Sequence, residues 1–306
     1  MNVITIISKI KKNFNNLLCG INAFGLSVGL KRYFYYEIFI RYGRCRDKYI
    51  KLIYSYLENS LAAIIEEYKF IDDGALDSDE SKNIWVCWWQ GYDNMPELCK
   101  MCYENLVRNK PHDYIVHLIT QDNYRQYVDI PDFIFERMDS GFLTITQFSD
   151  ILREALLYYQ GGLWIDSSVW TTPDFYRFID TKANFWSIKL DHIYKEYMIG
   201  QVISECKWTG FFMYGKKGNV VTKFAFDGMC DYFKKNEVTI DYFIQNFIIK
   251  IGYNNIPLIR ESIDRIPLSN SHIYALFLKL NYPFVEDEWD VMVSDTGAFK
   301  LSKSQI

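Results

Sequence analysis

Residues 146–174, TQFSDILREALLYYQGGLWIDSSVWTTPD, decide the fold of this 306-residue chain. Apolar side chains recur every three or four positions through residues 148–159, with charged residues between them, which predicts an amphipathic helix. Two glycines follow, and they predict its end because glycine adopts the left-handed backbone common at helix C-termini. The apolar run 163–165 then predicts a short strand buried on both faces, and Asp166 comes directly after it.

Asp166 is the first candidate for a functional contact. An aspartate at the end of a buried strand is costly to desolvate unless a charged or hydrogen-bonding partner meets it. Open α/β sheets also bind their ligands at the carboxyl ends of the strands. We therefore expect Asp166 to contact a metal ion or a substrate. The alternative is a structural role, in which Asp166 caps a turn formed by Ser167 and Ser168.

The same stretch resembles the signature of the capsular polysaccharide synthesis glycosyltransferases, which are relatives of glycosyltransferase family 32. Their pattern is a helix of the type F-S-D-x-L-R, then two glycines, an apolar run and an aspartate; the matching residues are 148–153 and 161–166. The resemblance extends from IWVCWWQG at 84–91 to DYF at 241–243. It implies a GT-A fold, an α/β nucleotide-binding domain with a mostly parallel central sheet flanked by helices.

The order of elements agrees with an α/β domain. Predicted strands alternate with predicted helices, which implies a parallel sheet with right-handed crossovers. Strands are expected at residues 84–90, 113–119, 184–190 and 209–214, and further helices at 96–109, 219–235 and 241–251.

Composition sets the broad class. The chain is 49% hydrophobic and 18% aromatic, which excludes a disordered protein and supports one large core with an appendage. Its seven cysteines have no regular spacing and no secretory signal precedes them, so we expect a reducing compartment. The C-x-x-C at 99–102 has no second pair to complete a zinc site, and we assign it no role.

Charge is distributed unevenly along the chain. Residues 1–51 carry ten basic and two acidic side chains, although the whole chain has a net charge of −4. A basic, aromatic-rich helical segment suits peripheral contact with an anionic membrane surface, and a solvated face or a protein-docking surface is the alternative. Residues 13–30 are too polar and too short to predict a membrane span. We expect a basic helical region at 1–70, an acidic linker at 71–82 and the GT-A-like domain at 83–306, in the cytoplasm at the inner face of the membrane.

The resemblance also implies a divalent cation, Mn²⁺ or Mg²⁺, held by Asp166 and Ser168 together with the phosphates of a nucleotide sugar. This chain departs from the family twice. The family triplet often ends in a second aspartate where Ser168 stands, and a histidine commonly occupies the position of Phe299, before Lys300. We expect a metal held by fewer protein ligands rather than a less active protein.

Further site residues follow from helix spacing and from the resemblance. Asp150 and Arg153 lie three residues apart and therefore share one helix face. The resemblance implies that Asp150 contacts the sugar hydroxyls and that Arg153 contacts an aspartate or a phosphate. The alternative is an ion pair between these two residues within the helix. Trp88 and Gln90 stand at the end of the first predicted strand, where a base could stack on the indole and have its edge read by the amide. We expect at least one of the two tryptophans there, Trp88 and Trp89, to pack in the core instead.

Four other residues complete the expected substrate-binding set. Lys217, in a turn, could reach phosphate or a lipid-linked acceptor, although lysines in turns are usually only solvated. Asp241 is most simply a carboxylate at the start of a helix, and its match to the family's DYF element is the ground for also placing it near the acceptor. Gly161 and Gly162 are the other two residues of the expected substrate-binding set. The four histidines of the chain are assigned no role.

These observations predict a bacterial-type glycosyltransferase that moves one sugar from a nucleotide donor to a growing capsular or other surface polysaccharide, or to its lipid-linked precursor. Retention of anomeric configuration is implied by the resemblance alone, and nucleic acid is not an expected partner. Two alternatives come from other classes. One is an aspartate-dependent phosphohydrolase, which normally needs a second aspartate where Ser168 stands; the other is a catalytically weak, membrane-associated binding subunit of a polysaccharide assembly complex.

Overall fold

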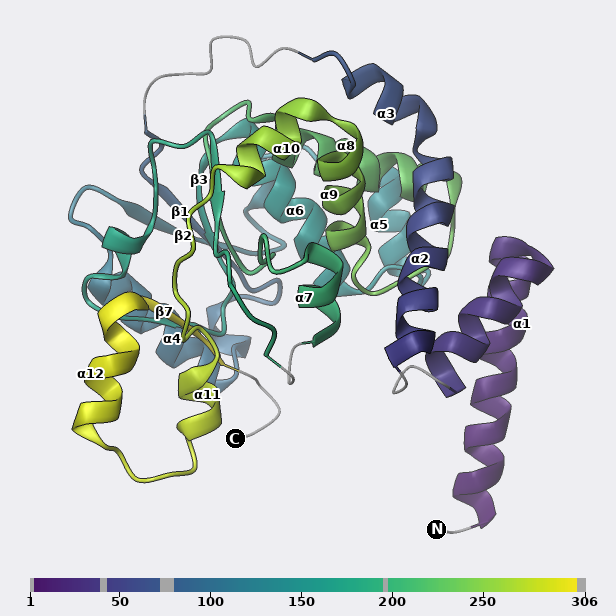
Figure 1. Cartoon of the computed structure of the whole chain (residues 1–306), viewed down its shortest axis with the longest axis horizontal. Helices are drawn as coiled ribbons and strands as arrows, with labels where there is room; N and C mark the ends of the chain where they lie inside the picture. The colour runs from purple at the N-terminus through teal and green to yellow at the C-terminus, as the bar shows by residue number, and fades with distance from the viewer. Residues whose placement is uncertain (1–2, 39–42, 72–79, 195–197, 302–306) are drawn as a thin grey trace.

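A computed structural model describes residues 3–38, 43–71, 80–194 and 198–301, so most of the predicted 71–82 linker lies outside the described residues. The chain forms a mixed α/β structure (Figure 1). Its α-helices are α1 (Val3–Tyr33), α2 (Gly43–Ser60), α3 (Ala62–Tyr68), α4 (Glu97–Asn109), α5 (Asp132–Asp139), α6 (Ile145–Tyr159), α7 (Met198–Ser204), α8 (Val220–Lys235), α9 (Ile244–Asn255), α10 (Pro257–Asp264), α11 (Ala275–Lys279) and α12 (Glu286–Asp295). Its strands are β1 (Asn83–Cys87), β2 (Ile115–Ile119), β3 (Gly162–Ile165), β4 (Val169–Thr171), β5 (Phe185–Ser187), β6 (Phe212–Gly215) and β7 (Ala298–Lys300).

The central sheet has five strands in the order β2-β1-β3-β6-β5. Strand β1 is parallel to both β2 and β3, whereas β6 is antiparallel to its neighbours β3 and β5. Four of the strands therefore run in one direction and β6 alone runs in the other. This confirms the predicted α/β class with a mostly parallel sheet; the narrower GT-A assignment stays a prediction.

The predicted helix, glycine pair and strand at the centre of the sequence are confirmed. The Thr144 hydroxyl caps α6 by accepting from the Gln147 backbone amide. The Gln147 side chain in turn accepts from the Thr144 backbone amide, which completes a capping box. The helix ends before two glycines with positive φ, Gly161 at 67° and Gly162 at 109°. A Cβ on Gly162 would lie 2.4 Å from the Asn83 carbonyl oxygen of β1, so this close approach of two strands requires glycine.

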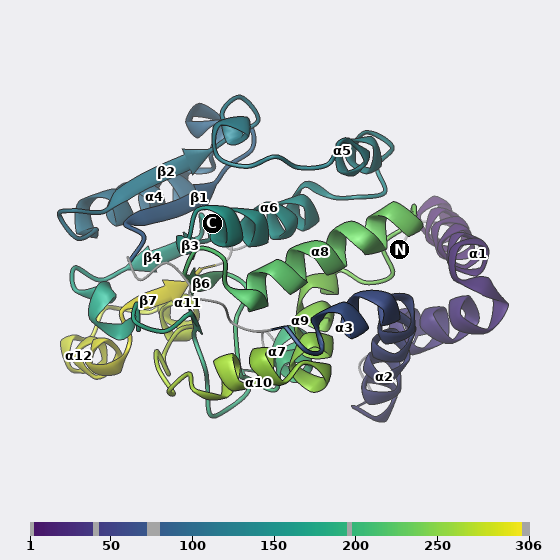
Figure 2. The same cartoon turned by 90° about the horizontal axis from the view of Figure 1, so that it is seen from above.

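Helix layers build outward from one side of the sheet. Helix α6 packs on β1, β3 and β6, α8 packs on α6, α9 on α8, and α2 on α9. Figure 2 shows α1 and α2 on the side of the molecule away from β2. Helix α6 thus lies between the sheet and the outer helices, and its nearly complete burial follows from this position.

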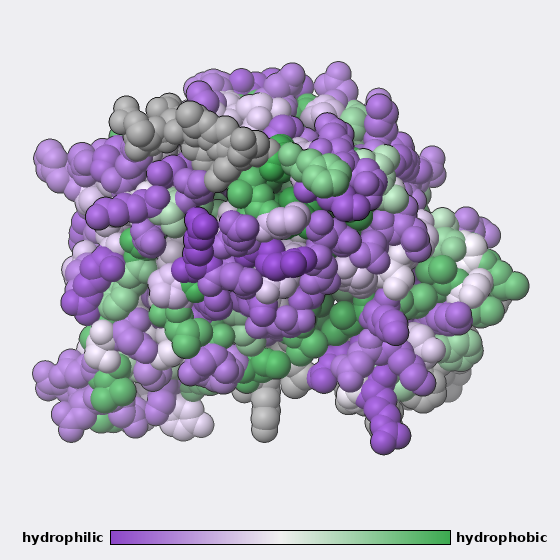
Figure 3. All heavy atoms as spheres, turned by 45° about the horizontal axis from the view of Figure 1, so that its top comes forward, coloured by the Kyte–Doolittle hydropathy of each residue, from purple (hydrophilic) through white to green (hydrophobic). Residues whose placement is uncertain are grey.

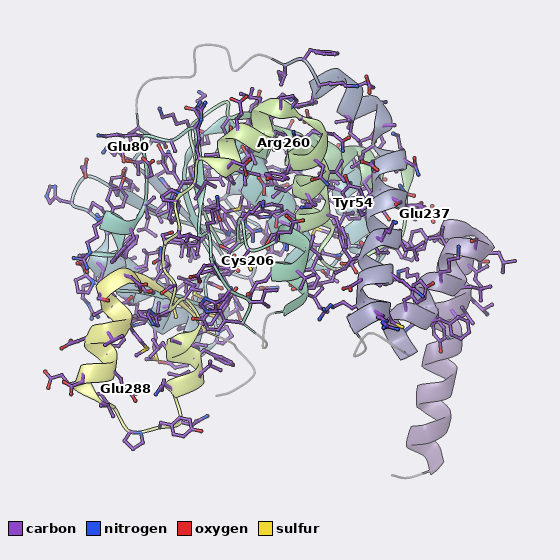
Figure 4. All side chains as sticks on the ribbon, in the orientation of Figure 1. Tyr54, Glu80, Cys206, Glu237, Arg260 and Glu288 are labelled. Carbon is purple, nitrogen blue, oxygen red and sulfur yellow. The ribbon has the colours of Figure 1, made fainter. Side chains whose placement is uncertain are left out.

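Helices α2 and α3 belong to the same core as the sheet. Tyr49, Ile53 and Leu57 of α2 are at most 1% exposed and join a single apolar cluster with residues of β1, β3 and α9. Figure 4 shows Tyr54 of α2 beside α9, where its hydroxyl accepts from Asn254 at 3.0 Å. The described part of the predicted 1–70 region is therefore not an independent appendage, because α2 supplies side chains to the common core.

Helix α1 is the most peripheral element. It bends at Gly25 (φ 79°, ψ 162°), and Arg32 Nε near its end donates to the Ile240 carbonyl at 2.6 Å. In Figure 3 apolar atoms gather at the right-hand edge, where Figure 1 places α1. Two leucines of this helix, Leu18 and Leu26, are exposed. None of the helices in the described part of the chain has the length and apolar character that crossing a bilayer requires.

Candidate active site

A pocket of about 470 Å³ opens where β1 and β3 end. Its position is the one that open α/β sheets use for ligands, because side chains after neighbouring parallel strands meet at the same edge. Asp166 lies in its wall, as expected from the sequence. The lining residues are Cys87, Trp88, Trp89, Gln90, Ile145, Thr146, Ser149, Trp164, Asp166, Ser167, Ser168, Tyr242, Lys300 and Leu301.

Asp166 is held by three donors from three elements. Its Oδ1 accepts from Arg153 Nη2 at 3.1 Å and from Trp164 Nε1 at 2.9 Å, and its Oδ2 accepts from Lys300 Nζ at 2.6 Å. Burial raises the pKa of Asp166, but the charges of Lys300 and Arg153 outweigh burial, and the pKa lies below its ordinary value. The carboxylate is therefore ionised and paired with two cations.

Lys300 reaches the pocket through a second, two-stranded sheet. Strands β4 and β7 pair antiparallel, with Val169 opposite Lys300, and the Leu301 amide donates to the Ser168 carbonyl at 2.8 Å. This pairing brings the end of the chain back to the turn that follows Asp166. Lys300 was not among the predicted site residues, because its short local sequence, Lys300-Leu301-Ser302, carries no periodic or strand-end signal.

Arg153 lies behind Asp166 rather than in the pocket lining. It is only 4% exposed, and its Nη1 donates to Asp150 Oδ1 at 2.9 Å and to Gln245 Oε1 at 2.8 Å. Its guanidinium also lies over the Trp164 ring, 4.9 Å from the ring centre. Burial lowers the pKa of Arg153, but the charges of Asp150 and Asp166 outweigh burial and raise it. Arg153 thus forms the intrahelical pair with Asp150 that was the alternative, and it also contacts an aspartate outside its helix, Asp166.

Asp150 and its neighbour Glu154 are carboxyl groups with raised pKa values. Burial, opposed by the charge of Arg153, raises the pKa of Asp150 to about 6. Glu154 is fully buried, and this burial raises its pKa to about 8. One Glu154 oxygen accepts from Gln245 Nε2, and the other has no hydrogen-bond partner among the residues that the structure describes. Asp150 is not a lining residue, so the expected contact with sugar hydroxyls has no support from the geometry.

The two tryptophans after β1 have different environments. Trp89 is half-buried: it packs against Phe148 and Tyr124 of the core, with ring centres 4.7 and 5.3 Å away, and it also lines the pocket. Trp88 and the exposed Gln90 line the pocket. The structure thus brings both residues that were expected to read a base to the same pocket as Asp166, and the packing alternative describes Trp89.

The residues around Asp166 fit a protein-held divalent cation poorly. Both carboxylate oxygens already accept from cationic or indole donors, and Ser168 is only 5% exposed. Phe299 is fully buried against Trp170 and Trp289 and does not line the pocket. In the described part of the chain, no group of three or more histidine, cysteine, aspartate or glutamate side chains is arranged to hold a metal.

Gly161, Gly162 and Lys217 do not lie at this pocket, which corrects their predicted substrate contacts. Gly162 pairs with Gly215 at the beginning of β3, whereas Asp166 follows the other end of that strand, roughly 13 Å away at 3.3 Å per residue. Lys217 is exposed and its backbone lies beside Gly161. The physical reason is strand direction: residues before β3 and residues after it emerge at opposite edges of the sheet.

Asp241 also has a structural role in place of the predicted acceptor contact. Its side chain is 4% exposed, accepts from the Tyr49 hydroxyl of α2, and accepts from the Phe243 amide at 2.6 Å. The next residue, Tyr242, is exposed and lines the pocket instead. Sequence periodicity could not reveal which of the two residues, Asp241 or Tyr242, faces the pocket, because both lie in the short connection before α9.

Comparison with known proteins gives one long match and two short ones. A family model described as capsular polysaccharide synthesis protein matches residues 36–305. The chain is 36% identical over 94 residues to O-glycosyltransferase braB of Annulohypoxylon truncatum, covering 28% of this chain and 22% of that protein. It is 29% identical over 97 residues to O-glycosyltransferase PaGT of Phomopsis amygdali, covering 29% of this chain and 24% of that protein. The chain therefore spans less than a quarter of the length of these two relatives.

Among solved structures, the PaToxG glycosyltransferase aligns with a TM-score of 0.39 at 14% sequence identity. The alignment covers 79% of this chain and 94% of that one.

Proposed function

Because the chain belongs to the capsular polysaccharide synthesis family, whose model matches residues 36–305, we propose that it is a glycosyltransferase that moves a sugar from a nucleotide-sugar donor to a glycan acceptor. The O-glycosyltransferase names of two partial relatives support the same reaction class. Our narrower proposal for the acceptor is a growing capsular or other surface polysaccharide, or its lipid-linked precursor. Retention of configuration and a GT-A type of fold are part of this proposal.

The observation that carries the proposal is the position of a charged cluster at the ligand-binding edge of the sheet. Asp166, Arg153 and Lys300 meet where β3 ends, and Asp166 and Lys300 face a pocket of about 470 Å³. Cations held in a fixed arrangement can stabilise the negative charge that develops on a departing diphosphate. Glycosyl transfer from a nucleotide sugar needs such a site, and it needs no strong base in the same place.

The aromatic wall suggests how the donor lies. Trp88 offers an indole beside Gln90, whose amide can donate to and accept from a base edge. With the base at this end, the diphosphate would extend toward Asp166 and Lys300. Tyr242, exposed at the rim, is then the best-placed residue for the acceptor.

Peripheral membrane contact through residues 1–51 remains a proposal, and with it a location at the inner face of the membrane. Within this range α2 presents the exposed basic residues Arg44, Lys48 and Lys51. We expect the protein to co-sediment with vesicles that contain anionic lipid, and the triple change of these residues to Glu to abolish co-sedimentation. Equal co-sedimentation of the two proteins would contradict this assignment.

The test of the function is a thermal-shift panel of UDP, GDP, CDP and CMP and their sugars, with and without Mn²⁺ or Mg²⁺. A ligand at 100 times its dissociation constant stabilises a protein by about 2.7 kcal/mol, which is an easily measured shift. We expect one nucleotide class to stabilise the wild type, and its sugar form to release nucleotide when an acceptor glycan is added. The two metal arms test the predicted cation at Asp166 and Ser168.

Two variants make the result specific to the pocket. Asp166→Asn should lower transfer by at least 100-fold, because Arg153 and Lys300 lose the group that orients them. Lys217→Met, at the opposite edge of the sheet, is the matched control and should leave transfer unchanged. Failure of every nucleotide and nucleotide sugar to shift the wild type would overturn the proposed function.

A further inference from the structure

Lys300 has the features of a cation built into the protein. Its side chain is 16% exposed, its ammonium lies 2.6 Å from Asp166 Oδ2, and it lines the pocket. The same ammonium lies 5.0 Å from the centre of the Phe211 ring. Pairing in β7 and contact with an aromatic face hold it in one place, so it differs from a solvated surface lysine.

The ammonium retains donors after it has bound Asp166. A lysine carries three N–H donors, and the contact with Asp166 uses one of them. A divalent cation approaching Asp166 would have to displace this ammonium from Oδ2, while Arg153 and Trp164 already occupy Oδ1. The charge of the carboxylate is therefore already compensated by two cationic side chains, Arg153 and Lys300.

We propose that Lys300 takes the place of a metal ion, so that its ammonium binds the diphosphate of the donor and no divalent cation is required. This inference rests on the proposed function. In the transfer, the bond between the anomeric carbon and the terminal phosphate oxygen breaks, and both electrons leave with that oxygen. The acceptor hydroxyl oxygen forms the new bond to the anomeric carbon, and its proton passes to the departing diphosphate. Lys300 neutralises the oxygen that receives the electron pair.

The experiment compares wild type, Lys300→Met and Lys300→Arg for binding of UDP, GDP and CDP by calorimetry, each in EDTA and in Mn²⁺. We expect the wild type to bind one of them with the same dissociation constant, within about threefold, in both conditions. Lys300→Met should bind at least about tenfold more weakly in EDTA. Mn²⁺ should restore part of this loss, because removing the ammonium frees Asp166. Lys300→Arg keeps the charge and should bind in EDTA nearly as the wild type does.

Manganese binding gives a readout that does not depend on activity. In solutions of MnCl₂ alone, we expect the electron paramagnetic resonance signal of free Mn²⁺ to be unaffected by wild type and reduced by Lys300→Met. Lys217→Met, the same change at the opposite edge of the sheet, should behave as the wild type in both experiments. Its circular dichroism spectrum and that of Lys300→Met should match the wild type, which separates lost binding from lost folding.

The outcomes distinguish this inference from the function on which it rests. If the wild type binds a nucleotide only with Mn²⁺, or if Lys300→Met binds in EDTA as tightly as the wild type, the inference is wrong and the function stands. If none of UDP, GDP and CDP binds the wild type in either condition, the inference is overturned; the function is overturned as well only if CMP and the nucleotide sugars of the thermal-shift panel also fail to bind.

Discussion

One buried arginine connects most of the charges at the site. Arg153 contacts Asp150, Asp166 and Gln245, and Gln245 in turn donates to Glu154. A buried charge without a partner is far more costly than an exposed one, because little solvent remains to stabilise it. The stability of this part of the protein and the geometry of its pocket therefore depend on the same side chain.

Arg153→Met should lower the free energy of unfolding by about 3–5 kcal/mol, since it leaves Asp150 and Asp166 without their shared partner. The control is Arg177→Met, which removes a pair with Asp174 between two side chains that are both more than half exposed, and should cost about 0–1 kcal/mol. Urea unfolding of the three proteins measures both values. Similar losses in the two variants would show that the buried network contributes no more than a surface pair.

Glu154 predicts a pH dependence with a definite sign. Its pKa is about 8 in the folded protein against an ordinary value of 4.5, so between these pH values the folded state retains a proton that the unfolded state releases. The free energy of unfolding should therefore fall as pH rises through this window. Glu154→Gln removes the titrating group, and it should be more stable than the wild type at pH 8 by on the order of a few kcal/mol and little different at pH 5.

Urea unfolding at pH 5, 6, 7 and 8 measures this difference. Glu66→Gln is the control, because it neutralises an exposed carboxylate paired with Lys69 on the surface and should cost only about 0–1 kcal/mol. A constant difference between Glu154→Gln and the wild type across this range would contradict the raised pKa.

At the scale of elements, the site depends on how two short strands are placed. Strand β3 carries Asp166 to the edge of the sheet, and β7 carries Lys300 to the same point by pairing with β4. The close approach of β3 to β1 is possible because Gly162 has no side chain. A small change in this glycine should therefore affect the alignment of the pocket wall as well as stability.

Gly162→Ala and Gly141→Ala form a matched pair. Both glycines have positive φ, 109° and 74°, but a Cβ on Gly162 would lie 2.4 Å from the Asn83 carbonyl oxygen, whereas nothing lies within 4 Å of one on Gly141. Gly141→Ala should cost about 1 kcal/mol from backbone strain alone. Gly162→Ala should cost at least twice as much, since the strand must also move, and urea unfolding measures both. Equal costs would mean that β1 and β3 can separate without loss.

At the scale of the whole molecule, one core joins the N-terminal helices to the sheet. Leu57 of α2 and Leu61 before α3 are fully buried in the cluster that includes Ile84 of β1 and Leu163 of β3. Tyr49 of this region also donates to Asp241, just before α9. We therefore expect residues 43–301 to unfold together rather than as two units.

Leu57→Ala tests this unity. Removing a fully buried leucine should cost about 2–5 kcal/mol, and one cooperative transition should shift as a whole, whether it is followed by circular dichroism or by tryptophan fluorescence. Leu26→Ala, on the exposed side of α1 at 65% exposure, is the control and should change stability by less than about 0.5 kcal/mol. If the fluorescence transition did not move in Leu57→Ala, α2 would form a unit separate from the sheet, because all of the tryptophans lie beyond residue 84.

The sequence by itself determined the local pattern of this protein. The period of apolar residues in 148–159, the glycine pair and the buried run before Asp166 all follow from interactions within a few residues, and the structure confirms them. The mostly parallel α/β sheet was also predictable, because alternating strands and helices permit few other arrangements. The pocket residues Trp88, Gln90 and Asp166 could be found because each lies near the carboxyl end of a recognisable strand.

Only the tertiary structure decided which charges meet. Lys300 is 134 residues from Asp166 and reaches it by pairing of β7 with β4, which no local pattern encodes. The environment of Glu154 depends in the same way on α8, which packs on α6, and on Gln245 of α9, which donates to it. Conversely, Lys217 and Asp241 match plausible motifs but do not lie at the pocket. Lys217 lies at the opposite edge of the sheet, and Asp241 lies just before α9, in contact with α2. The physical reason is range: helix and strand periods depend on neighbours in the chain, whereas desolvation and ion pairing depend on neighbours in space.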